Sequence, residues 1–91
     1  MKANEAVREI MKAQKKTAVY IKDKINQRNK EIGLDVKEVK ARNISDRLTQ
    51  DNISIEKLRE MVVFLDYKIV LVPYDKKLKE GEYEIEWFTH I

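Results

Sequence analysis

The sequence predicts a mostly α-helical domain in which four helices precede two antiparallel strands. Apolar residues recur at helical spacing over residues 1–65, helix start signals divide that region, and residues 66–91 change to strand-like patterns. With 91 residues, the chain is expected to form a single domain with a thin core. A domain of that size often gains stability from a partner subunit.

The first two helices are expected over about residues 4–15 and 17–31. Asn4 and Thr17 are the candidate N-caps, because their side chains can accept a hydrogen bond from the first turn. Apolar residues at helical spacing fill one side of each helix: Val7, Ile10 and Met11, then Ala18, Ile21 and Ile25. Gly33 suits the position after the second helix, since glycine takes a left-handed conformation at little cost.

The third helix is expected over residues 35–50 and the fourth over residues 54–65. Asp35 with Glu38 three residues later resembles a capping box, with aspartate in place of the usual serine or threonine. Ser54 is the start signal of the fourth helix. The residues expected to face inward from the fourth helix are Leu58, Met61, Val62 and Leu65.

A hairpin is expected at the end of the chain, with strands over about residues 67–72 and 82–88. The first, "YKIVLV", is β-branched and apolar on both faces, whereas the second, "EYEIEW", alternates strictly. The intervening "PYDKKLKEG" holds the only proline. Because a lone hairpin is marginal in water, it must pack on the helices, pair with another chain, or both.

Composition excludes several classes of function. Without cysteine there is no disulfide framework, thiol chemistry or cysteine-based zinc site. No apolar run approaches the roughly 20 residues of a membrane span, and no secretory signal is visible, so we expect a soluble cytoplasmic protein without a membrane partner. The single histidine, His90, and the lack of a Gly-rich phosphate loop make an enzyme, a metal or a cofactor unexpected.

Charge is distributed unevenly along the chain. Residues 1–50 hold 13 lysines and arginines against 7 acidic residues, whereas residues 51–91 hold 6 against 9. A basic half next to an acidic half favours a polyanion-binding end and a second end with a different task. The alternative is chance, because 38% of the residues are charged.

Three stretches carry a family resemblance: "NEAVREIMKAQ", "ISDRLTQDNISIEKLREMVVFLDYKIVLVP" and "KLKEGEYEI". They resemble helix-turn-helix regulators of the Cro/repressor, or xenobiotic-response-element, type that phages and prophages of low-GC Gram-positive bacteria carry. The resemblance implies a helix-turn-helix domain over residues 1–91, bound as a homodimer to double-stranded DNA and regulating transcription. Asp66 stands where that family often has glycine.

The middle of the chain departs from the family and allows two matchings. Matching backward from Ile44 leaves about ten extra residues between "TAVYIKDKI" and "VKARNISDRL". Matching on Gly33 keeps a three-residue turn, "GLD", but lengthens both helices. The capping box and the glycine favour the second matching, although it places Asp35 and Glu38 where DNA would meet the wrong charge.

The resemblance implies DNA contacts on the third helix, and the start of the second helix is a separate candidate that its capping residue and charge suggest. Arg42 and Asn43 occupy base-reading slots, since arginine suits guanine and asparagine suits adenine. The other expected contacts are Ser45 and Arg47 beside the DNA backbone, Lys37 and Lys40 as added positive charge, and Lys15, Lys16 and Thr17 as a phosphate site at the start of the second helix. The alternatives are a solvated ladder of Arg42, Asp46 and Gln50, and plain capping by Thr17.

Two classes of function therefore remain at this point. The first is a sequence-specific DNA-binding regulator that reads the major groove with its third helix. The second is a phage-type module that reuses the same shell to bind a protein, as an anti-CRISPR, antirepressor or antitoxin-like partner. The residues expected at the homodimer interface are Tyr67, Ile69, Leu71, Tyr83, Ile85 and Trp87.

Overall fold

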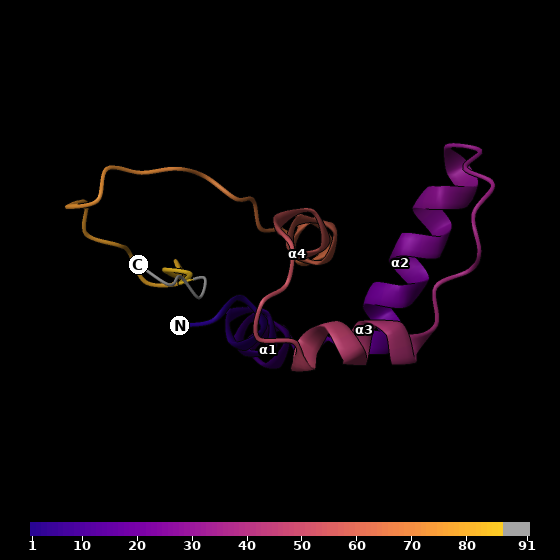
Figure 1. The fold of residues 1–91 in the computed structure, drawn as a ribbon, viewed down its shortest axis with the longest axis horizontal. Helices are drawn as coiled ribbons and strands as arrows, with labels where there is room; N and C mark the ends of the chain where they lie inside the picture. The colour runs from indigo at the N-terminus through magenta and orange to yellow at the C-terminus, as the bar shows by residue number, and fades with distance from the viewer. Residues whose placement is uncertain (87–91) are drawn as a thin grey trace.

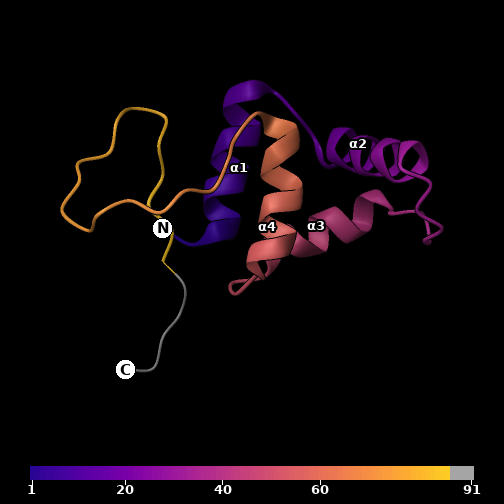
Figure 2. The ribbon, with the colours of Figure 1, turned by 90° about the horizontal axis from the view of Figure 1, so that it is seen from above.

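The computed structural model describes residues 1–86, and within them the chain folds into helices alone. The elements are α1 (Ala3–Gln14), α2 (Ala18–Glu31), α3 (Ala41–Thr49), α4 (Ile55–Val62) and the single 3₁₀ turn η1 (Val63–Leu65). Helices α1 and α4 lie side by side, and α2 and α3 pack against each other on one side of that pair (Figures 1 and 2). Helix α3 also contacts α1, so it joins the two halves.

The core fills the space between these helices. The fully buried side chains are Val7, Ile21, Ile25, Ile44, Ile53, Met61 and Leu65. The apolar stripes of α1, α2 and α4 are therefore the ones that helical spacing predicts. The expected ranges of the first, second and fourth helices agree with the observed elements within one residue, if η1 is counted with α4.

Left-handed residues end the first two helices. At the end of α2, Gly33 has φ 71°, and Leu34 N–H donates to the Asn29 carbonyl at 2.8 Å, as in a Schellman motif. The prediction for Gly33 is thus confirmed. Lys15 takes the same left-handed conformation after α1, with φ 56°, although a side chain is disfavoured there.

Asn4 is buried inside α1 and is not its N-cap, which is Lys2. Its Nδ2 atom donates to the Leu48 carbonyl at 3.1 Å and so ties the start of α1 to the end of α3. The prediction that Asn4 caps α1 was wrong, because the Leu48 carbonyl, which is distant in sequence, lies beside the first turn of α1 and binds the Asn4 side chain.

The third helix begins at Ala41 and not at Asp35. Residues 32–40, which we call the link, form no helix and contain both members of the expected capping box, Asp35 and Glu38, as exposed side chains. The Asn26 side chain instead binds both backbone groups of Val39, at 2.8 Å each. This clamp holds the chain extended before α3. The prediction of a three-residue turn between the second and third helices was therefore wrong. The matching on Gly33, which required a third helix from residue 35, is therefore contradicted by the structure.

The expected C-terminal hairpin is absent from the described residues. Residues 67–86, which we call the arm, loop away from the helices and return without pairing as strands (Figures 1 and 2). Tyr83 and Ile85 pack against the core, and Glu86 N–H donates to the Met1 carbonyl at 2.8 Å. The end of the arm is therefore held along the N-terminus and beside Tyr67, whose ring centroid lies 6.2 Å from that of Tyr83, but it forms no strand pair with residues 67–72. Trp87 and the end of the expected second strand lie outside the described residues.

Candidate nucleic-acid interface

The inward side of α3 is fixed by packing. Ile44 is fully buried, and Leu48 packs against the same core. Helix α3 contacts both α1 and α2, and Asn4 holds the carbonyl of Leu48. These contacts leave only one side of α3 to face another molecule.

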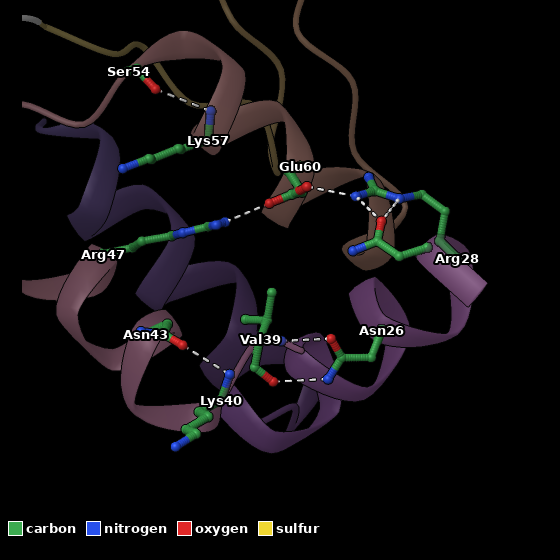
Figure 3. A network of polar contacts seen from close by, with 10 residues as sticks. Asn26, Arg28, Val39, Lys40, Asn43, Arg47, Ser54, Lys57 and Glu60 are labelled. Carbon is green, nitrogen blue, oxygen red and sulfur yellow. Dashed lines mark hydrogen bonds and ion pairs between the residues drawn. The ribbon is translucent and has the colours of Figure 1, made fainter. Parts of the chain in front are cut away.

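Glu60 joins three helices (Figure 3). Its two carboxylate oxygens accept from Arg28 Nη2 of α2 at 2.6 Å and from Arg47 Nη1 of α3 at 2.8 Å. Burial by itself raises the pKa of Glu60, but the hydrogen bonds from the two guanidinium groups outweigh it, so this pKa lies below its ordinary value. Glu60 on α4 thereby fixes α3 against α2 through charge-assisted hydrogen bonds.

Arg47 therefore forms an ion pair within the chain and is not free for another molecule. Its side chain reaches toward Glu60, as Figure 3 shows, and is mostly buried. The sequence placed Arg47 beside the DNA backbone, whereas the structure places its guanidinium between α3 and α4. Ser45 remains exposed on α3.

A chain of hydrogen bonds sets the start of α3 (Figure 3). Asn26 binds Val39, and the next backbone group, Lys40 N–H, donates to Asn43 Oδ1 at 2.9 Å. Reading adenine needs both the oxygen and the nitrogen of an asparagine carboxamide. Because the oxygen of Asn43 caps α3 here, this side chain acts as a capping group in the structure.

Arg42 is a cation of α3 that makes no polar contact within residues 1–86. It is exposed, and within residues 1–86 its guanidinium forms no hydrogen bond or ion pair. The ladder of Arg42, Asp46 and Gln50, which was the alternative to DNA contact, does not form among these residues. Lys37 and Lys40 are exposed nearby, and both line a shallow hollow with Asn43.

The start of α2 shows plain capping. Thr17 Oγ1 accepts from Tyr20 N–H at 3.3 Å. Lys16 lies over the Tyr20 ring, 4.2 Å from its centroid, while Lys15 is exposed in its left-handed conformation. The structure therefore supports the capping alternative for Thr17 and leaves Lys15 exposed beside it.

The residues expected at a dimer interface separate into two groups. Tyr67, Tyr83 and Ile85 pack within the chain, where Tyr67 also donates its hydroxyl to the Gly81 carbonyl at 2.9 Å. Ile69 and Leu71 are exposed. Trp87 is outside the described residues.

Sequence reasoning did not find the Arg28–Glu60–Arg47 cluster or the Asn26 clamp. A signal was present for the first: Arg28 and Asn29 continue the buried stripe of Ile21 and Ile25 at helical spacing. A polar residue on an apolar stripe requires a partner, because burying it alone is costly. The identity of that partner depends on the fold.

Comparisons with protein-family models, with curated proteins and with solved structures gave no match. Among residues 1–86, no group of three or more histidine, cysteine, aspartate or glutamate side chains is placed to hold a metal ion. No helix in this part of the chain is long and apolar enough to cross a membrane.

Proposed function

We propose that this protein binds double-stranded DNA through the outward side of α3 and thereby regulates transcription. The observation that carries this proposal is Arg42, which is exposed and unpaired within residues 1–86 and lies on a helix that is fixed from its other sides. A DNA major groove admits one α-helix, and arginine is the side chain best suited to guanine there.

The expected roles of the other residues change with their contacts. Arg42 is the base reader, and Lys37 and Lys40, exposed before and at the start of α3, neutralise phosphates. Asn43 and Arg47 hold α3 in place through Lys40 and Glu60. An α3 fixed in advance lowers the ordering cost of binding.

A second candidate function is the binding of a protein, and the link is the observation that favours it. Ile32, Leu34 and Val36 are large apolar residues that the link exposes beyond the end of α2. Exposed apolar groups rimmed by charge are typical of protein interaction sites. In this alternative, α3 would be a solvated helix.

The experiment compares two arginine variants with equal loss of charge. A random duplex library identifies the preferred site of the wild-type protein. On that site Arg42→Ala should weaken binding by about 1–3 kcal/mol and remove the preference at one base position. Arg59→Ala, an exposed arginine of α4, is the matched control and should keep the preference. Lys40→Ala should weaken all duplexes alike and reduce the salt slope by about one unit.

Two results would count against DNA binding. One is a wild-type protein that binds no duplex at moderate salt. The other is an Arg42→Ala variant whose affinity and base preference equal those of Arg59→Ala. Circular dichroism shows beforehand that each variant keeps its helices. Either result would favour the protein-binding alternative.

A further inference from the structure

A hollow of about 320 Å³ lies between α2 and the end of η1. Two aromatic rings, two cations and two carboxylates contribute to its lining: Tyr20 and Phe64, Lys24 and Arg28, and Glu31 and Asp66. We call it the α2 hollow, and among residues 1–86 none of its lining residues belongs to α3 or to the link. A volume of this order is at the lower end of what small-ligand sites enclose.

The charges of the α2 hollow exclude the simplest ligands. A bare anion would meet the carboxylates of Glu31 and Asp66, and a bare cation would meet Lys24 and Arg28. A purely apolar ligand would remove water from these charged groups without replacing its hydrogen bonds. A ligand that suits the whole lining therefore combines a negative charge, hydrogen-bond donors and a flat ring.

Cations lie over the aromatic rings on this side of α2. The ammonium groups of Lys16 and Lys24 are 4.2 and 5.6 Å from the centroid of Tyr20. Neither lysine forms a hydrogen bond or an ion pair within residues 1–86. Because a lysine stem is flexible, each ammonium can turn toward a phosphate while a base takes its place over the ring. Single-stranded nucleic acids are bound by this combination of aromatic rings and cations.

Asp66 supplies a hydrogen-bond acceptor without a partner in residues 1–86. The other carboxylate, Glu31, already accepts from the Gln27 side chain at 3.1 Å. A carboxylate accepts from the amino group of cytosine, whereas thymine, the other pyrimidine of DNA, presents a carbonyl oxygen at that position. Asp66 therefore favours cytosine over thymine.

We propose that the α2 hollow binds one base of a single-stranded nucleic acid and prefers cytosine there. The base stacks on Tyr20 beside Phe64, and Asp66 accepts from its amino group. Lys24 contacts the adjoining phosphate, which adds affinity without sequence preference. This surface is separate from α3, so the inference goes beyond duplex binding and does not rest on it.

Only an unpaired base can enter the hollow in this way. Freeing one base from a duplex costs its stacking and its pairing, whereas the bases of a single strand are already accessible. The ligand is therefore a single strand, and not the duplex proposed for α3.

Fluorescence anisotropy of labelled oligonucleotides, titrated with the full-length protein, tests the stacking. Strands of about 12 nucleotides suit the site sizes of single-strand-binding surfaces, and oligo(dC) should bind about fivefold more tightly than oligo(dT). Tyr20→Leu loses the ring but keeps an apolar side chain, and it should weaken oligo(dC) binding about tenfold. Tyr20→Phe keeps the ring and should remain within about twofold of the wild type.

Asp66→Asn tests the base preference without disturbing the backbone. Asp66 has φ 63°, a left-handed conformation that asparagine also tolerates. The amide that replaces the carboxylate can donate to thymine as well as accept from cytosine, so oligo(dC) and oligo(dT) should bind equally. A variant that keeps the cytosine preference would overturn the assignment of Asp66.

Lys24→Gln tests the phosphate contact. It should weaken oligo(dC) and oligo(dT) alike, by about threefold, and reduce the salt slope by about 0.7. Lys30→Gln is the matched control, because Lys30 is an exposed lysine of α2 that does not line the hollow. This control should leave both affinities within about twofold of the wild type.

Four results would overturn the proposal, provided that circular dichroism shows each variant to be folded. They are a wild type that binds no single strand at moderate salt, equal binding of oligo(dC) and oligo(dT) by the wild type, equal effects of the two Tyr20 variants, and equal effects of the two lysine variants. With oligo(rC) added, the tighter of the two cytosine strands identifies the ligand as RNA or DNA. Arg42→Ala should leave oligo(dC) binding unchanged, and Tyr20→Leu should leave the duplex preference unchanged, so failure here is distinguishable from failure of duplex binding.

Discussion

Leu65 and Leu71 are six positions apart, and their surroundings contrast the two regions of the molecule. Leu65 ends the helical body and is fully buried, whereas Leu71 in the arm is almost fully exposed. The helical body is held by an apolar core and by Glu60, which bonds to two other helices. The arm contacts the helical body through residue 67 at its start and through residues 83–86 at its end. The difference teaches that, among residues 1–86, the buried core lies within residues 3–65, and the arm adds only partly buried side chains to it.

Leu65→Ala tests the body at its most buried position. Removing a fully buried leucine side chain leaves a cavity, so the free energy of unfolding should fall by about 2–5 kcal/mol. Urea denaturation followed by circular dichroism measures this change. A loss below about 1 kcal/mol would show that Leu65 is not part of a close-packed core.

Glu60→Gln tests the polar connection between the helices. It removes the charge that Arg28 and Arg47 share, and the free energy of unfolding at neutral pH should fall by about 1–3 kcal/mol. Glu56→Gln, on the exposed side of the same helix, is the matched control and should change it by less than about 0.5 kcal/mol. Equal effects of the two variants would contradict a special role for Glu60.

The difference in the free energy of unfolding between the wild type and Glu60→Gln should depend on pH with a definite sign. Because the pKa of Glu60 is lowered in the folded state, its contribution is complete above the ordinary glutamate pKa of about 4.3. The contribution is lost as the pH falls through the lowered pKa. The stability difference between wild type and Glu60→Gln should therefore stay constant from neutral pH down to about pH 5 and shrink in more acidic solution. A difference that grows on acidification would reverse the assigned direction.

Lys15→Gly tests a strained position at the edge of the body. Lys15 has a left-handed conformation that glycine adopts without cost, so the variant should be more stable by about 0.5–1 kcal/mol. Lys12→Gly, the same change within α1, should instead destabilise by a similar amount. Thermal melts of the two variants should shift in opposite directions, and a shared direction would refute the conformational argument.

Leu71→Ala should have the smallest effect of the series. At micromolar concentration, where one chain is studied alone, the free energy of unfolding should change by less than about 0.5 kcal/mol. Leu65→Ala is the same substitution in the body, so the pair measures the contrast between the regions directly. A large loss for Leu71→Ala at that concentration would show that the arm packs on its own chain.

Local patterns predicted the body well and the connections poorly. The stripes around Val7, Ile25 and Met61 follow from helical spacing, which each helix carries in its own sequence. The start of α3 does not, because Asn26 binds Val39 from thirteen positions away and overrides the local signal at Asp35. Contacts between distant residues decide such boundaries.

The expected hairpin and the expected DNA contacts of α3 were also limited by contacts between distant residues. Alternation put Tyr83 and Ile85 on one side of their segment, and both pack against the core, whereas the sequence had assigned them to a strand at a dimer interface. Arg42 and Arg47 are both arginines of α3, and the sequence assigned both to DNA. Only the position of Glu60 on α4 distinguishes them, and that position follows from the packing of three helices.

The link gives the chain a place where it can be lengthened. A side chain at Gly33 would meet no atom within 4 Å, although its left-handed backbone should be retained, and the next three residues are exposed. Doubling the length of such a loop costs only about 0.6 kcal/mol in closure entropy. The clamp joins Asn26, before the insertion point, to Val39, after it, and neither residue is changed by the insertion. An affinity tag or a fluorescent reporter inserted between Leu34 and Val36 should therefore leave the orientation of α3 unchanged.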